Sequence, residues 1–307
     1  QANELFKRLK PGKQELYIFV DELELTNNKT KAYQRDIKLI RDLIAAVYNL
    51  NLEIKKNNFK IRLIAGVRSE VVNSIIATGK EINKMISDFG LSLYWHQPGH
   101  EISHPLIRII TSRLKYTHKL KNPGIDFSES ELWKSYFPEV IKNKPSAEYI
   151  LHQTWYRPRD MVRILKIAQN HFPEDHQFTN SLISNIAKEY SLQSWTEQVE
   201  ELNSIYTPEE IEGIKELFYG SKSNFSFGDL GRVSDTKKQF YPKVTSLLGK
   251  YPIGKILSDL YRVGVIGNSG NIMRFAFRGD DEVLLEKEMV IHAALTRALS
   301  IEFEVRR

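Results

Sequence analysis

The sequence predicts an α/β unit followed by a mainly α-helical chain, and three observations support this fold class. Short apolar runs alternate with helical periodicity up to residue 95, helical patterns alone continue from about residue 104, and the order helix, helix, β-hairpin follows residue 229. The 307 residues are 41% hydrophobic and 27% charged, which is enough for two or three domains with cores of their own. We expect these domains to span residues 1–120, 121–225 and 226–307.

Three apolar runs in the first region predict buried strands over 16–20, 61–67 and 91–95, because they are short and rich in β-branched and aromatic residues. Apolar residues at helical spacing predict a helix over 31–52, and a second helix is expected over 69–78. The connections are long enough for parallel pairing of the strands. We therefore expect a parallel sheet that is buried on both faces.

The middle of the chain is predicted to be helical. Pro105, Pro158 and Pro208 each stand near an expected helix start, where a missing N–H group costs little. The stretches 121–128 and 221–228 contain Gly, Asn and Ser and are the expected linkers. The expected helices span residues 104–119, 129–137, 145–153, 159–171, 179–201 and 207–219.

The last region has the element order of a winged helix-turn-helix module. Helices are expected over 229–241 and 252–263. The stretch 272–278 alternates like a strand, and the turn residues 267–270 precede it. The remaining expected elements are a returning strand over 286–292 and a short helix over 293–299.

Composition excludes several classes of protein. The chain has no cysteine, which rules out disulfides, a cysteine zinc site and a cysteine nucleophile. No apolar run reaches 18 residues and no signal-peptide pattern opens the sequence, so we expect a cytoplasmic protein without a membrane partner. The net charge of +6 divides into +8, −6 and +4 over residues 1–120, 121–220 and 221–307, a distribution that permits a nucleic-acid partner.

An apolar strand that ends in two acids is the pattern of a Walker B element, and here Asp21 and Glu22 follow the run 16–20. In a parallel sheet such strand ends face the crevice where ligands bind. Asp21 can hold Mg²⁺ there, since Mg²⁺ prefers oxygen ligands and keeps much of its water shell. Glu22 can orient or deprotonate the water that attacks a γ-phosphate. Alternatively, the two acids are solvated residues at an ordinary strand end.

Arg68 follows the second expected strand, so parallel pairing delivers it to the same edge of the sheet as the two acids. Its guanidinium can contact a phosphate, or the nucleotide of a neighbouring subunit in a homo-oligomer. Alternatively, Arg68 pairs with Glu70 or another surface carboxylate, an interaction that contributes little to stability.

The segment 154–160, Thr-Trp-Tyr-Arg-Pro-Arg-Asp, opens another expected helix. Asp160 complements the dipole at a helix start, whereas Arg157 and Arg159 oppose it and are tolerated more readily beside an anion or a carboxylate. These arginines can therefore report the nucleotide state from a helical lid. Alternatively, they belong to a buried Arg–Asp tether between helices.

The stretches YIFVDELE at 17–24, RLIAGVRSEV at 62–71, LSLYW at 91–95 and YRPRDMVRIL at 156–165 resemble a bacterial P-loop ATPase family. This family is STAND-like and AAA+-related, has an RPRD motif after its nucleotide domain, and is often found in mobile or phage-defence contexts. The resemblance covers most of residues 14–200 and extends more weakly to the C-terminal winged helix.

The resemblance implies a fold and a set of roles. It implies that residues 1–120 are part of a P-loop NTPase sheet, followed by a helical lid or arm and a winged helix. Asp21 matches the Mg²⁺-binding Walker B acid, Glu22 the hydrolytic acid and Arg68 a sensor-like position. Arg157 and Arg159 match the lid arginines, and the cofactors implied are ATP and Mg²⁺.

The Walker A motif G-x-x-x-x-G-K-[ST] is missing from the 307 residues. The four Gly-Lys pairs are followed by Gln, Glu, Tyr and Ile, and none has the needed glycine spacing after a strand. Because a Walker A precedes Walker B, we expect the P-loop to lie upstream of Gln1. This chain would then be the C-terminal portion of a larger ATPase and would bind nucleotide weakly or not at all by itself.

The expected helix over 252–263 carries polar residues opposite its apolar face, namely Lys255, Ser258 and Arg262. Such a face can enter a DNA major groove while Arg274 and Arg278 of the wing contact phosphates. Alternatively, the module packs internally or binds a protein partner. Three acids would repel the DNA backbone: Asp259, Asp280 and Asp281.

Other candidate sites are weaker. His96, His100 and His104 recur at a spacing of four, which suits a metal site on a helix, but Pro98 and Gly99 break that helix. A metal nuclease built on Asp21, Glu22 and Glu24 lacks an evident lysine and second carboxylate strand.

Taken together, the residues and the resemblance predict an ATPase that couples hydrolysis to rearrangement of its helical and winged-helix parts. The alternative is a non-catalytic regulator that binds DNA or protein on a degenerate nucleotide-binding scaffold. A Walker A upstream of this chain would favour the first.

Overall fold

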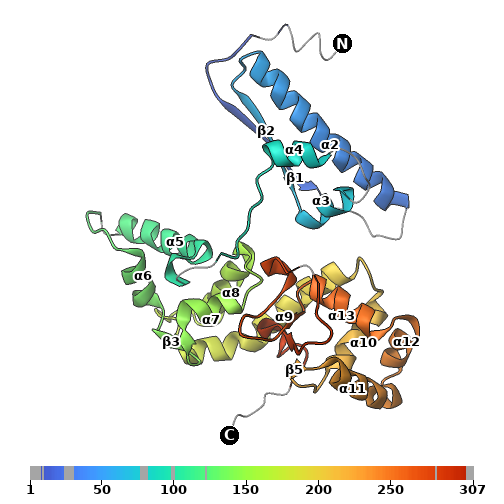
Figure 1. Ribbon diagram of the computed structural model, residues 1–307. Coiled ribbons are helices and arrows are strands. Elements are labelled where there is room, and N and C mark those ends of the chain that lie inside the picture. Colours follow the sequence, from blue (N-terminus) through green and yellow to red (C-terminus); the bar gives the residue numbers. More distant parts are fainter. Residues whose placement is uncertain are drawn as a thin grey trace. The chain divides into compact units, whose positions relative to one another are not determined.

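The computed structural model describes residue 8 and residues 10–23, 31–76, 82–97, 101–121, 123–280 and 282–301. These residues fall into two compact units, one that ends at Leu93 and one that begins at Tyr94 (Figure 1). This division into two units does not test the three domains expected from the sequence, which stay a prediction.

The first unit is a small α/β structure. In Figure 1 its long helix α2 runs alongside two paired strands. β1 and β2 pair in parallel, as predicted, and residue pairs such as Val20 and Ala65 are in register. The elements are β1 (Leu16–Leu23), α2 (Lys31–Lys56), β2 (Ile61–Val67), α3 (Ser69–Ile76) and α4 (Ile82–Phe89).

The core of the first unit is built from helical spacing. Ile37 and Ile40 of α2 are buried against Val71 and Ile75 of α3. Alternate residues of β2 are partly buried, whereas the residues between them are exposed. The sheet is thus covered on one face, and the prediction of a sheet buried on both faces is wrong for the described residues.

The third expected strand, over 91–95, is not formed. Residues 91–97 have no regular structure, and the side chains of Leu91, Leu93 and Tyr94 are 84%, 74% and 71% exposed. Their apolar character matched a buried strand, but no described neighbour pairs with their backbone. The preceding helix α4 was missed because its eight residues carry few strong helix formers.

The second unit begins with the predicted helices. Each forms within a few residues of its expected ends, and Pro105, Pro158 and Pro208 occupy first helical positions. A two-residue hairpin of β3 (Val140–Ile141) and β4 (Lys144–Pro145) was not predicted. The helices are α5 (Pro105–Lys121), α6 (Glu129–Tyr136), α7 (Ser146–His152), α8 (Pro158–His171), α9 (Asn180–Leu202) and α10 (Pro208–Phe218), with a short 3-10 helix η1 (Glu101–Ser103) before α5.

The C-terminal part packs helices against a small antiparallel sheet of order β5-β7-β6. The expected strand over 272–278 is wrong: Arg274 makes one isolated bridge to Asn268, and the next residues form the 3-10 helix η2. Helix α12 was missed. The elements are β5 (Asn224–Phe225), α11 (Phe227–Phe240), α12 (Pro242–Lys250), α13 (Ile253–Arg262), β6 (Ile266–Asn268), η2 (Ala276–Arg278), β7 (Met289–Ile291) and the 3-10 helix η3 (Ala293–Leu295).

One hydrophobic core runs through the whole second unit. It contains residues from Leu106 of α5 to Ile301, so the helical part and the C-terminal part share it. Among the described residues, no helix combines the length and the apolar character needed to cross a membrane.

Candidate functional site

Two of the predicted site residues lie at the same end of the sheet in the first unit. Because β1 and β2 are parallel, Asp21 near the end of β1 and Arg68 just after β2 lie at the same end of the sheet. The register between the strands shifts after Val20, so β1 is irregular where the acids stand. Such irregularities redirect side chains at a strand end.

The Asp21 carboxylate lies close to the backbone of β2. A Cβ atom added to Gly66 would be 3.3 Å from Asp21 Oδ1, so the absence of a side chain at Gly66 leaves room for this carboxylate. Asp21 and Arg68 are both exposed to solvent. The backbone of Glu22 belongs to β1, while its side chain, like the whole of Glu24, lies outside the described residues.

Sequence reasoning missed Asn51, which occupies part of the edge of β2 that does not pair with β1. Its side-chain Nδ2 donates to Leu63 O at 2.9 Å, and its Oδ1 accepts from Leu63 N at 3.0 Å. These two bonds replace those of a neighbouring strand at Leu63. A further strand can pair at this position only if Asn51 moves.

The arginines of the RPRD segment differ in their surroundings. Arg157 forms an ion pair with Glu201 of α9, with 2.9 Å between Nη2 and Oε1. Arg159 is exposed and makes no ion pair with a described carboxylate. Of the two arginines, Arg159 is therefore the one that can meet an anion without breaking an existing pair.

Asp160 is the centre of a buried polar network. It is fully buried, accepts a hydrogen bond from Trp155 N at 3.0 Å, and pairs with Arg163 at 2.7 Å. Arg163 also pairs with Glu197 of α9. Burial raises the pKa of Asp160, while Arg163 and the Trp155 N–H act in the opposite direction. The network fastens the start of α8 to α9 through Arg163, whereas the tether interpretation had placed Arg157 or Arg159 in this role.

Trp155 connects the same segment to the C-terminal part. Its indole Nε1 donates to Gly264 O at 2.8 Å, and its ring stacks on His292 with 4.1 Å between centroids. Gly264 has a φ of +80°, and a Cβ there would lie 2.7 Å from Trp155 Cδ1. Tyr156 also has a positive φ, +52°, which turns the chain into α8. Sequence reasoning missed this role because the partners lie more than 100 residues away.

The expected DNA-contacting residues are mostly engaged within the protein. Lys255 Nζ lies 2.5 Å from Oδ1 of Asp259. Asp259 is fully buried, so it does not face the DNA backbone that it was expected to repel. Arg274 pairs with Asp280 at 3.0 Å. The other contacts are the Ser258 hydroxyl to Gly254 O and the Arg278 guanidinium to Met273 O and over the ring of Tyr156.

Arg262 is the exception in this group. It is exposed and makes no ion pair with a described carboxylate. Among the five predicted residues, one exposed cation without an ion pair to a described carboxylate is a much smaller electrostatic footprint than a five-residue interface.

The histidines do not form a metal site among the described residues. His96 and His104 both pack edge-on against the Tyr156 ring, and burial lowers the pKa of each. His104 Nδ1 also accepts from Leu106 N at the start of α5. His100 lies outside the described residues.

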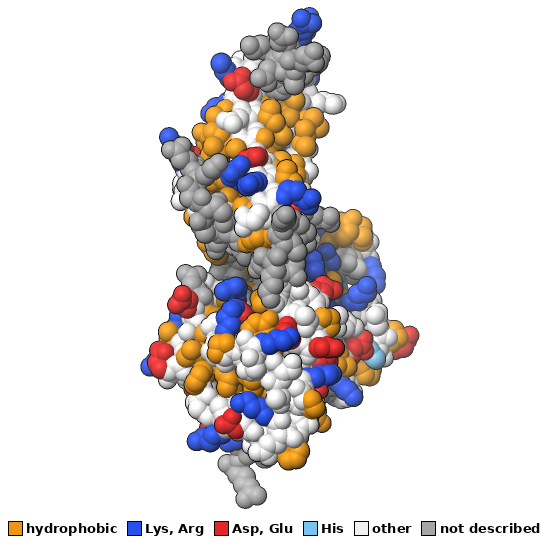
Figure 2. All heavy atoms as spheres, turned by 90° about the vertical axis from the view of Figure 1, so that its right-hand side faces the viewer, with side chains coloured by type: hydrophobic (Ala, Val, Ile, Leu, Met, Phe, Trp, Pro, Cys, Tyr) orange, Lys and Arg blue, Asp and Glu red, His pale blue; other side chains and the backbone are white. Residues whose placement is uncertain are grey.

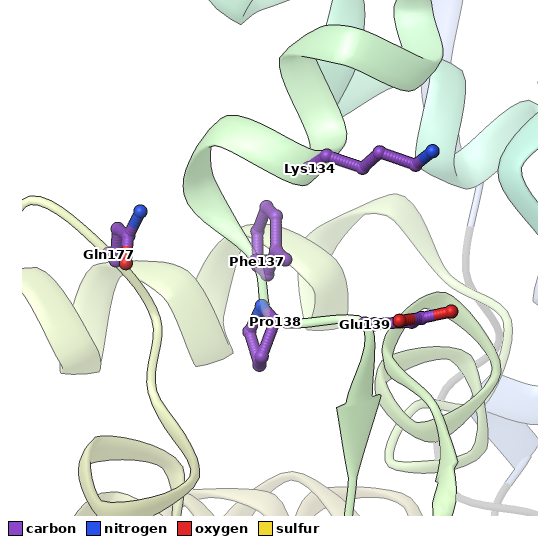
Figure 3. Close-up of a pocket in the computed structure, with 5 residues that line it drawn as sticks. All are labelled: Lys134, Phe137, Pro138, Glu139 and Gln177. Atoms are coloured by element: carbon purple, nitrogen blue, oxygen red, sulfur yellow. The ribbon is translucent and has the colours of Figure 1, made fainter.

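A shallow depression of about 340 Å³ lies beside the loop after α6. Figure 3 shows Lys134 and Glu139 extending in the same direction, while Gln177 stands apart on the segment before α9. The side chains do not converge on one point, so this depression has no evident ligand.

Residues 104–197 match a family described as the FunZ-associated C-terminal helical domain. The match runs from the start of α5 into α9 and includes the RPRD segment. It covers less than half of the chain and so describes this helical segment rather than the whole protein. No curated protein and no solved structure matches the chain.

Proposed function

We propose that this chain supplies the Walker B edge and the helical, switching part of an ATPase. The observation that carries the proposal is the parallel pairing of β1 and β2, which brings Asp21 and Arg68 to one end of the sheet. Asp21 is exposed at this end of the sheet and offers oxygen ligands of the kind that Mg²⁺ prefers. In this proposal Asp21 holds Mg²⁺, Glu22 acts on the attacking water and Arg68 contacts phosphate, in its own subunit or in a neighbour's.

The proposed switch is the second unit. Asp160 of the segment 154–160 pairs with Arg163 of α8, which in turn pairs with Glu197 of α9. Trp155 of the same segment donates a hydrogen bond to Gly264 in the C-terminal part. An anion held by Arg159 would act on the start of α8, which these contacts already connect to α9 and to the C-terminal part. The β5-β7-β6 sheet and the helices before it support a winged-helix type of module.

Turnover by the intact protein tests the catalytic assignment. In the protein that joins a P-loop to this chain, Glu22→Gln should abolish ATP hydrolysis while sparing ATP binding. Glu15→Gln, at the opposite end of the β1 region, is the matched control and should leave turnover unchanged. Normal turnover in Glu22→Gln would disprove the role of this acid.

Calorimetry on the 307-residue chain tests the need for a P-loop. We expect weak binding of Mg-ATP or none, because no phosphate cradle occurs in the sequence. Micromolar affinity would show that the described sheet edge binds nucleotide without that motif.

The second candidate function is a non-catalytic regulator. It is favoured by the absence of a strand over 91–97, which leaves two described strands in the first unit. DNA binding through Arg262 and its neighbours would weaken steeply as salt increases. An absent or salt-insensitive shift of duplex DNA would leave protein partners as the remaining form of this function.

A further inference from the structure

The second unit begins with four residues, 94–97, that have no regular secondary structure. Among the described residues, no backbone-to-backbone hydrogen bond fastens this segment to the rest of the unit. Three of its four side chains are exposed, and the exception is His96, which is partly buried. The His96 ring packs edge-on against the ring of Tyr156, with 4.6 Å between centroids. This ring contact therefore holds the segment on the second unit.

The Tyr156 ring also contacts a guanidinium group. Tyr156 is 7% exposed, and its positive φ of +52° turns the chain into α8. The guanidinium of Arg278 lies over the same ring, with 5.2 Å from its Cζ to the ring centroid. Arg278 makes no ion pair with a described carboxylate, and the neighbouring Asp280 pairs with Arg274 instead. His96 thus shares one ring with a permanent positive charge.

The His96 ring has no acceptor for a second buried proton. Its Nδ1 is buried and has no hydrogen-bond partner in the described part of the chain. A neutral imidazole carries one N–H group, whereas an imidazolium donates from both nitrogens. Protonation in this position would therefore bury an unsatisfied N–H group at the ring that already carries the Arg278 charge. Burial lowers the pKa of His96, Arg278 lowers it further, and Asp280 acts in the opposite direction.

Two other histidines face this cluster, and both are held by helices. His104 packs edge-on against the Tyr156 ring at 5.5 Å, and its Nδ1 accepts from a backbone N–H at the start of α5. Burial and His96 lower the pKa of His104, whereas the Trp95 carbonyl acts in the opposite direction. His152 is the last residue of α7, and burial lowers its pKa, with a smaller contribution from His96. Of these three histidines, His96 is the one that can leave the cluster without moving a helix.

We propose that His96 makes a pH-dependent contact: the neutral ring holds residues 94–97 against Tyr156, and protonation releases them into water. In water both nitrogens of the imidazolium find acceptors, away from the Arg278 charge. Because the bound ring has a pKa below the ordinary value of 6.5, the contact should be complete above about pH 6.5 and weaken as the pH falls below it. Release would lengthen the unstructured connection that follows α4. This inference does not rest on the proposed ATPase activity.

The test is nuclear magnetic resonance of the full chain, labelled with carbon-13 in the histidine and tyrosine rings, between pH 8 and pH 5. The ring shifts of His96 report its protonation, and the nuclear Overhauser effect between the His96 and Tyr156 rings reports the contact. We expect both to change with one midpoint below pH 6.5. The effect between the His104 and Tyr156 rings should persist at that midpoint and shows that the unit is still folded. A His96 contact that persists at pH 5, or loss of both contacts together, would overturn the proposal.

The matched variants are His96→Phe and His176→Gln. His96→Phe keeps an aromatic ring at the contact but cannot take up a proton, so the contact between position 96 and Tyr156 should persist to pH 5. His176→Gln removes an exposed histidine and should keep the native pH dependence. Loss of the contact in His96→Phe over the native pH range would show that another group releases the segment, and the proposal would then be wrong.

Discussion

The two units differ in how they treat hydrophobic and charged side chains. In the first, β1 leaves Phe19 70% exposed and Tyr17 47% exposed, and Figure 2 shows hydrophobic side chains gathered on one face of this unit. In the second, Trp155 is 2% exposed and one core extends through the whole unit. The large side chains of the second unit are thus mostly buried in its core, whereas β1 of the first unit leaves large apolar side chains exposed, a feature typical of interaction surfaces.

The charged motifs follow the same division. Asp21 and Arg68 are exposed at a sheet edge, whereas Asp160 and Asp259 are fully buried and paired with cations. Similar sequence patterns thus lie in different surroundings, and burial of Asp160 and Asp259 is possible because each has a cation beside it. Asp21 and Arg68 are thus exposed to solvent, whereas Asp160, through Arg163, holds α8 against α9.

The largest expected effect comes from Trp155→Ala. Loss of a buried indole, its stacking on His292 and its bond to Gly264 should lower the free energy of unfolding by about 3–5 kcal/mol. Urea unfolding followed by circular dichroism measures this. Tyr116→Ala, at a 67% exposed aromatic residue, is the control and should change it by less than about 0.5 kcal/mol. Similar losses in both variants would contradict the connecting role of Trp155.

Asp160→Asn should have the next largest effect. The substitution keeps the shape of the side chain but removes the charge that Arg163 and the Trp155 N–H contact, at a cost of about 1.5–3 kcal/mol. Asp126→Asn removes an exposed partner of Lys115 and should leave the unfolding midpoint unchanged. If the two variants were equally stable, the network would not be structural.

Acid should destabilise the second unit through two histidines, the buried His292 and the partly buried His152. Burial lowers the pKa of His292 to about 3 and that of His152 to about 4, from an ordinary value of 6.5. The unfolded chain therefore takes up protons at these positions that the folded chain does not, and stability should fall as pH drops from 6.5 towards 3.

Unfolding curves between pH 7.5 and 4.5 measure this dependence, and His152→Gln should make it shallower. His176→Gln, at an exposed histidine, is the control and should keep the native slope. A native slope in His152→Gln would show that this histidine is not held neutral by the fold.

The smallest effect is expected in the first unit. Phe19→Ser should change the free energy of unfolding of this chain by less than about 0.5 kcal/mol, because the side chain is already largely in water. Denaturant unfolding of the isolated chain is the measurement. A large loss would mean that this face is covered in solution, which would remove the contrast between the two units.

Local patterns predicted most of the helices. Apolar residues at helical spacing and prolines at first helical positions located α2 and α5 to α10. The strand over 91–95 failed because an apolar run becomes a strand only when a neighbour pairs with its backbone. The strand over 272–278 failed because its aromatic residues pack around Arg278 instead of alternating between two faces.

By itself, the sequence determined the helix positions and the parallel pairing of β1 with β2, because periodicity and crossover length depend on nearby residues. It also indicated that Asp21 and Arg68 share one edge. Tertiary structure alone decided which charges stay exposed, that Arg157 pairs with Glu201, and that Trp155 contacts Gly264. These outcomes depend on residues distant in the chain, whose proximity arises only when the core forms.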